Sequence, residues 1–160
     1  MKTVLVIIAT LGLFACGQQA EKKSDSGTGN ATGIYKEYLD VKNALVNSDV
    51  KKARETSSKL EASLKSASDS SAVKAAGIAG EIAKSEKLED QRTAFAGLSE
   101  ALISMAKNGS LGKNTFFVQH CPMAMNSKGA NWLSNEQEIR NPYFGDQMME
   151  CGEVTEEIKK

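Results

Sequence analysis

The chain has 160 residues, and its 20 basic and 20 acidic side chains give a formal net charge of zero. A chain of this length has room for one domain with a modest core. The balanced charge argues against a nucleic-acid-binding protein, because phosphates attract a basic face. It also gives no indication of binding to a strongly anionic membrane surface.

The first 16 residues have the features of an export signal. Lys2 precedes an apolar run at residues 4–14, which is too short to span a membrane as a helix. The sequence LFACG, which contains Cys16, resembles a bacterial lipobox. This resemblance implies a signal peptide at 1–16 and a mature protein whose first residue, Cys16, carries acyl chains as a membrane anchor. The alternative is an ordinary signal peptide with a bystander cysteine.

Residues 17–33 are rich in Ser, Gly, Lys and Gln and almost lack large apolar side chains. Such a segment cannot bury enough surface to fold, so we predict a flexible tether. The residues after Cys16 also lack the acidic character of a surface-export signal. We therefore expect a lipid-anchored protein of the cell envelope, on the periplasmic face of the outer membrane.

Residues 34–109 carry the spacing of amphipathic helices. Apolar side chains recur in steps of three and four within four segments that are separated by polar breaks. Because short connections join these segments, we predict an all-α fold, an antiparallel four-helix bundle. We expect its apolar stripes, Met105 included, to form the core. An irregular C-terminal lobe at 110–155, with short extended segments and a short helix, should pack on the bundle, followed by a tail at 156–160.

The predicted lobe concentrates the residues that carry chemistry. Residues 116–152 hold the only His and Trp of the chain, both prolines and both cysteines beyond Cys16. Thiolate and thioether sulfurs are soft donors, and soft donors select Cu(I) over hard cations. The candidate metal ligands come from two clusters and are Cys121, Cys151, Met123, Met149, His120, Met125 and Met148.

The two clusters can form one site only if the chain between them turns back. The sequence LSNEQ resembles a capping box with Ser134 as N-cap, which predicts a short helix to about Arg140. This helix should end before Pro142, because the residue preceding a proline avoids the helical region. We expect the turn to bring Cys151 near Cys121. Three aromatic side chains should fill the lobe, namely Trp132, Tyr143 and Phe144.

The segments CPMAMNSKGANWLS, EIRNPYFG and MMECG resemble the signature of a Bacteroidetes-type bacterial domain family of uncharacterised function. Its members occur as lipoproteins and fused to periplasmic adaptor subunits of heavy-metal efflux pumps. The motif cysteines and methionines of that family match Cys121, Met123, Met149 and Cys151, whereas His120 is not part of its motif. The resemblance spans about residues 35–152 and implies metal traffic in the periplasm, with an efflux adaptor subunit as a partner.

These observations leave two hypotheses open. The leading one is a lipid-anchored protein that binds copper as Cu(I), for buffering or for delivery to efflux. The alternative is an interaction module of an envelope complex in which Cys121 and Cys151 form a structural disulfide, as export to an oxidising compartment favours. We do not expect an enzyme, because His120 and Cys121 are adjacent on an extended segment and should point to opposite sides.

Overall fold

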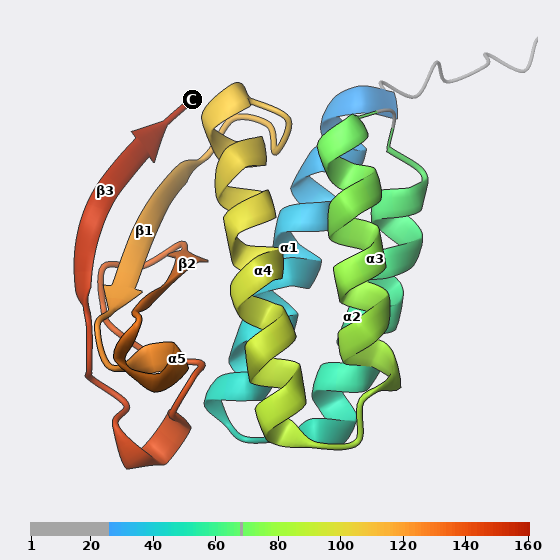
Figure 1. Cartoon of the computed structure of the whole chain (residues 1–160). Helices are drawn as coiled ribbons and strands as arrows, with labels where there is room; N and C mark the ends of the chain where they lie inside the picture. The colour runs from blue at the N-terminus through green and yellow to red at the C-terminus, as the bar shows by residue number, and fades with distance from the viewer. Residues whose placement is uncertain (1–25, 68) are drawn as a thin grey trace, which may run out of the picture.

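The computed structural model describes residues 26–67 and 69–160. Four helices lie side by side in Figure 1. They are α1 (Ser26–Val46), α2 (Val50–Lys65), α3 (Ser70–Lys84) and α4 (Leu88–Asn108). Among the described residues, no helix is both long enough and apolar enough to cross a membrane. The predicted signal peptide, Cys16 and the first part of the predicted tether lie outside the described residues.

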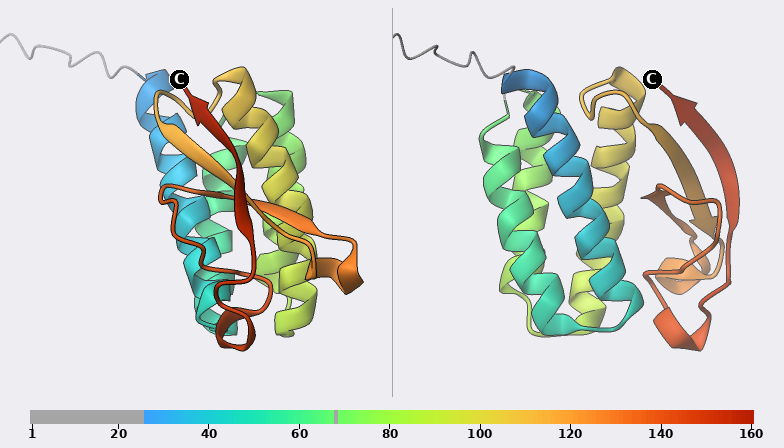
Figure 2. Two further views of the ribbon diagram at one scale, coloured as in Figure 1. Left: turned by 90° about the vertical axis from the view of Figure 1, so that its left-hand side faces the viewer. Right: turned by 180° about the vertical axis from the view of Figure 1, so that it is seen from behind.

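The C-terminal part of the chain forms a small antiparallel sheet with two short helical turns. Its elements are β1 (Thr115–Cys121), α5 (Ala124–Ser127), β2 (Ala130–Ser134), the 3-10 helix η1 (Gly145–Gln147) and β3 (Glu153–Lys159). The strand order is β2-β1-β3, so β1 is the central strand and pairs antiparallel with both neighbours. The sheet lies across α1 and α4 on one side of the helices (Figure 2).

The structure confirms the four packed helices and corrects the fold class. The chain is helix-rich with a C-terminal antiparallel sheet, so the all-α prediction is too simple. Helix α1 begins at Ser26, inside the range 17–33 that we predicted as a tether. Strand β3 runs through the boundary between the predicted lobe and the predicted tail at 156–160.

Side chains at the helix ends satisfy backbone groups that the helices leave unpaired. Asp49 accepts a hydrogen bond from the Lys52 backbone N–H at 2.8 Å, and Asp69 accepts one from Ser71 at 2.8 Å. Each carboxylate is therefore the N-cap of the helix that follows it. Gly109 ends α4 in the left-handed conformation, with φ 87°, which glycine adopts without steric cost.

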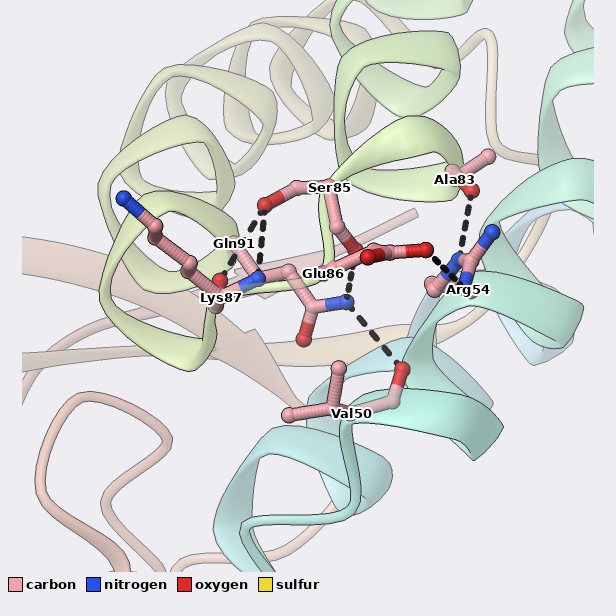
Figure 3. A network of polar contacts seen from close by, with 7 residues as sticks. All are labelled: Val50, Arg54, Ala83, Ser85, Glu86, Lys87 and Gln91. Carbon is pink, nitrogen blue, oxygen red and sulfur yellow. Dashed lines mark hydrogen bonds and ion pairs between the residues drawn. The ribbon is translucent and has the colours of Figure 1, made fainter.

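A polar network fixes the connection between α3 and α4 against α2 (Figure 3). The Gln91 side-chain amide donates hydrogen bonds to the carbonyls of Val50, at 3.1 Å, and Ser85, at 3.0 Å. The Arg54 guanidinium donates to the carbonyl of Ala83 at 3.2 Å. The carbonyls of Ala83 and Ser85 lie at the C-terminal end of α3, where no intrahelical donor is available.

The predicted helix from Ser134 to Arg140 is wrong. Ser134 instead ends strand β2, and its hydroxyl accepts a hydrogen bond from the backbone N–H of Glu136, two residues on. This bond closes a local turn, and no helix follows it. The carbonyls that follow are bonded by the buried Gln119 amide on β1, which donates to Glu136 at 2.9 Å and Glu138 at 3.0 Å.

Tyr38 of α1 joins the helices to the sheet. Its ring is fully buried, and its hydroxyl shares a 2.8 Å hydrogen bond with Ser99 of α4 and accepts a 3.0 Å bond from the backbone N–H of Leu133 on β2. The ring also stacks on Phe95, with centroids 5.3 Å apart. One side chain therefore holds α1, α4 and β2 together.

Replacing Tyr38 by Phe should destabilise the protein by about 1–3 kcal/mol, because the buried N–H of Leu133 and the hydroxyl of Ser99 would lose their partner. Tyr35→Phe is the matched control. The Tyr35 hydroxyl is buried and has no hydrogen-bond partner in the described part of the chain, so its removal should leave stability unchanged or raise it. Urea unfolding of the two variants measures the difference, and equal effects would contradict this assignment.

Lys42 of α1 is an unusual core residue, because its side chain is only 4 % exposed. Desolvation lowers the pKa of Lys42 from 10.5 to about 8; the nearby Glu136 carboxylate raises the pKa and Arg140 lowers it. Between about pH 8 and 10.5 the unfolded chain binds this proton and the folded chain does not. The free energy of unfolding therefore rises with pH across this window. Below about pH 8 both states carry the charge, and the full penalty of burying it applies.

Lys42→Met should raise the free energy of unfolding at pH 7 by roughly 2–3 kcal/mol, since it removes a buried charge from the folded state. Its advantage over the wild type should shrink as the pH rises from 8 to 10.5. Urea titrations at a series of pH values measure this. The exposed Lys59→Met variant is the control and should follow the wild type. A Lys42→Met advantage that does not change with pH would contradict the assigned pKa.

Candidate functional site

The two cysteines of the C-terminal part lie in contact. Cys121 is the last residue of β1 and is fully buried, whereas Cys151 lies just before β3 and is partly exposed. Their sulfur atoms are 3.1 Å apart, and both residues are free thiols. The prediction that the chain turns back to bring Cys151 near Cys121 is therefore confirmed.

An irregularity in β1 directs Cys121 inward. Phe116 and Val118 are buried in the first half of the strand, whereas Gln119 and Cys121 are buried in the second half. The register between β1 and β3 shifts between Val118 and Gln119, at the same step. A bulge of this kind changes which face of a strand a side chain occupies. It therefore places Cys121 in the core and His120 on the opposite side.

The contact with Cys121 favours the protonated form of Cys151. The hydrogen bond to the Cys121 sulfur raises the pKa of Cys151, and desolvation and the charge of Cys121 act in the same direction. The backbone N–H of Met123 donates toward the Cys151 sulfur and partly opposes the rise in pKa. The Cys151 thiol is thus a poor nucleophile without a cation, because it is the thiolate that attacks or binds a metal.

Asn141 holds the turn that carries Cys151. This fully buried side chain donates from Nδ2 to the Cys151 carbonyl at 2.8 Å. Its backbone N–H donates to the carbonyl of Met149 at 2.9 Å, and its Oδ1 accepts from the N–H of Tyr143 at 2.8 Å. Since all three bonds converge on one residue, the position of Cys151 depends on Asn141.

Gly152 allows the chain to approach β1 closely after the thiol pair. Its φ is 147°, and a Cβ at this position would lie 2.7 Å from the His120 carbonyl oxygen and 3.0 Å from the Trp132 ring. Any other residue would push the turn away from β1. The glycine therefore permits the short distance between Cys151 and Cys121.

The turn after Pro122 is a left-handed segment that presents two methionines. Met125, Asn126 and Ser127 have φ values of 52°, 57° and 62°. Left-handed helical geometry costs non-glycine residues roughly 1–2 kcal/mol each, so the surrounding contacts must impose it. Met123 precedes this turn and is 49 % exposed. Met125 is partly buried and packs against the core.

The remaining candidate ligands differ in their surroundings. His120 shares a 2.8 Å hydrogen bond between its Nδ1 and the Asn131 side chain, which in turn donates to Glu100 on α4 at 2.9 Å. The imidazole therefore belongs to a network that joins β1, β2 and α4. Met148 and Met149 lie in the turn before Cys151, and the Met148 carbonyl accepts the Cys151 N–H at 3.1 Å. In the described ranges, no group of three or more His, Cys, Asp and Glu side chains is arranged to hold a metal ion.

A family model described as a protein of unknown function, DUF3347, matches residues 34–114. The chain belongs to this family. The match runs from the third turn of α1 to the loop before β1, so it covers most of α1 and all of α2, α3 and α4. No curated protein and no solved structure matches the chain. The expected signature after Val118 lies beyond the matched residues, and its link to efflux adaptors stays a prediction.

The residues that support the thiols were not predicted from the sequence. The local sequence indicates only a helix end at Asn141, and it indicates no role for Gly152. Asn directly before Pro, followed by an aromatic residue, is a turn signal that pointed to the Asn141 interaction with Tyr143. The close approach of Gly152 to β1 depends on the pairing of distant strands, and no local pattern indicates it.

Asn141→Ala should destabilise the protein by about 2–3 kcal/mol, because it leaves the Cys151 carbonyl and the Tyr143 N–H without partners. It should also make Cys151 react faster with a thiol-alkylating reagent, since the turn would open more often. The exposed Asn135→Ala variant is the control and should behave as the wild type. Unchanged alkylation in the Asn141 variant would show that the turn is held by other contacts.

Proposed function

We propose that this protein is a non-enzymatic, lipid-anchored component of the bacterial envelope that binds Cu(I) through Cys121 and Cys151. The observation that carries the proposal is the pair of reduced sulfurs 3.1 Å apart, one buried and one at the surface. Two cysteine sulfurs form a soft donor pair that hard cations do not compete for. Binding replaces both thiol protons, so the affinity should increase with pH.

Met123 is the best-supported third ligand. Its backbone N–H donates toward the Cys151 sulfur, and the residue is 49 % exposed. Met149, two residues before Cys151, is the next candidate. We assign lesser roles to Met125 and Met148. His120 is the weakest candidate, because its ring is engaged with Asn131.

The lipobox at Cys16 and the resemblance of the C-terminal segments support a role in metal traffic at the membrane. The bound ion would be buffered in the periplasm or passed to an adaptor subunit of a heavy-metal efflux pump. The periplasmic face of the outer membrane is the proposed location.

A second candidate function follows from the same sulfur pair. Oxidation would join Cys121 and Cys151, which are 30 residues apart, and the chain would become an interaction module closed by a disulfide. A link of this span typically adds about 3–4 kcal/mol of stability. The fully buried Cys121 favours this reading, because its sulfur is shielded from reductants.

Cu(I) titration of the reduced chain from Gly17 onward, against a chromogenic chelator, separates the two functions. We expect one Cu(I) per chain, at least 100-fold weaker binding in Cys121→Ser and Cys151→Ser, and roughly tenfold weaker binding in Met123→Leu, since each removes one soft donor. Met105→Leu in the core of α4 is the control and should bind as the wild type.

Thiol counting before and after mild reduction completes this experiment. A fully reduced protein that does not compete with the chelator would reject Cu(I) binding. Thiols that react only after reduction in the protein purified from the envelope would then establish the disulfide module.

A further inference from the structure

The chain's one imidazole is kept apart from the thiol pair. His120 lies on the opposite face of β1 from Cys121, and its Nδ1 shares a 2.8 Å hydrogen bond with the Asn131 side chain. Within the described ranges, no three His, Cys, Asp and Glu side chains are grouped to hold an ion. Nitrogen and oxygen donors in a square-planar arrangement stabilise Cu(II), whereas thiolates and thioethers stabilise Cu(I). The surroundings of the thiol pair therefore favour the reduced form of copper.

The same two thiols can supply electrons to Cu(II). Their sulfur atoms are 3.1 Å apart, and both residues are reduced. A disulfide brings two sulfurs to about 2.0 Å, so forming the bond requires about 1 Å of side-chain movement. Two thiols that form a disulfide give up two electrons and two protons. Because each Cu(II) accepts one electron, one thiol pair reduces two ions.

The unequal burial of the two sulfurs determines the order of the steps. Cys151 is partly exposed, so Cu(II) meets this thiol first, whereas Cys121 is fully buried. A sulfur radical that forms on Cys151 has the Cys121 sulfur in contact with it. Since the Cys121 sulfur is shielded from other chains, the new bond forms within one chain.

We propose that the thiol pair reduces Cu(II) to Cu(I), and that Cys121 and Cys151 become a disulfide in the process. This inference rests on the proposed function, because it takes copper as the ion that reaches the pair. Cu(II) binds the Cys151 sulfur, displaces its proton and withdraws one electron. The Cys121 sulfur loses its proton and bonds to the Cys151 sulfur, and a second Cu(II) accepts the remaining electron. Two Cu(II) and two thiols thus give two Cu(I), one disulfide and two protons, which pass to the solvent.

This reaction joins the two candidate functions as two redox states of one site. The reduced pair binds Cu(I) through its sulfurs. The disulfide has no thiolate to offer, so the oxidised chain releases the Cu(I) that it has produced. Each chain reduces two ions in a single conversion, and the product is the module closed by a disulfide.

The test adds Cu(II) without oxygen to the reduced chain from Gly17 onward, in the presence of a chromogenic chelator that is specific for Cu(I). We expect two Cu(I) per chain, the loss of both thiols and a monomeric product whose mass has fallen by two hydrogen atoms. The reaction should be first order in protein, because both electrons come from the same chain. Copper that keeps the paramagnetic resonance signal of Cu(II), beside two thiols that still react, would overturn the inference.

A displaced second thiol is the matched control for the contact between the sulfurs. Cys121→Ser combined with Ser104→Cys keeps two thiols in the chain, but Ser104 is exposed and lines a hollow between α3 and α4. We expect this variant to form Cu(I) at least tenfold more slowly and to give disulfide-linked dimers, since a radical on Cys151 finds no sulfur beside it. Equal rates and a monomeric product in both proteins would contradict the proposed reaction.

Cu(I) titration of the same reduced protein separates failure of this inference from failure of the proposed function. Normal Cu(I) affinity without reduction of Cu(II) would overturn the inference and leave the proposed function intact. Reduction of Cu(II) that depends on the contact between the sulfurs, in a chain without affinity for Cu(I), would support the inference and overturn the proposed function.

Discussion

The hydroxyl group of Tyr38 is the constraint on which the rest of the structure depends. Its two hydrogen bonds, to Ser99 and from Leu133, fix the distance between the helices and the sheet. The aromatic contacts continue this connection from Phe95 to Tyr143 and from Tyr143 to Trp132, with centroids 6.0 and 5.9 Å apart. Other arrangements of the helices and the sheet are unfavourable, because they would leave a buried donor without an acceptor. The position of β2, and through it of β1, follows from this one side chain.

The thiol pair is a consequence of that placement. The register shift in β1 turns Cys121 toward the core, and Asn141 holds the turn that places Cys151 beside it. The contact with Cys121 raises the pKa of Cys151 and so favours the uncharged form of this thiol in the metal-free site. The left-handed turn that begins at Met125 is costly and is imposed by its surroundings. Backbone strain of this kind is enriched at functional sites.

Local patterns predicted the helices well and the sheet poorly. The four helices follow from the spacing of their apolar residues, which requires only neighbours three and four residues away. Strand β3 is mostly charged and exposed, so nothing in its own sequence distinguishes it from a tail; its pairing with β1 makes it a strand. The helix predicted at Ser134 is wrong because the prediction used only the local pattern. The bond that shapes this segment, from Gln119 to the carbonyl of Glu136, joins residues 17 apart. The approach of Cys151 to Cys121 was predicted from the assumption that the two sulfur clusters form one site. That assumption requires the chain between them to turn back. The supporting roles of Asn141 and Gly152 were not.

The family match and the candidate site occupy different parts of the chain, and the contacts between them show how they depend on each other. Tyr38, Arg92 and Ser99 lie within the matched residues 34–114. Tyr38 and Arg92 bond to Leu133 and Pro142, which lie outside it. Without the C-terminal part, the Tyr38 hydroxyl would lose the N–H donor of Leu133 and Arg92 the carbonyl acceptor of Pro142, although each side chain also has a partner within the helices. The helices are therefore a platform for a C-terminal part. In this chain, that part carries two cysteine sulfurs 3.1 Å apart.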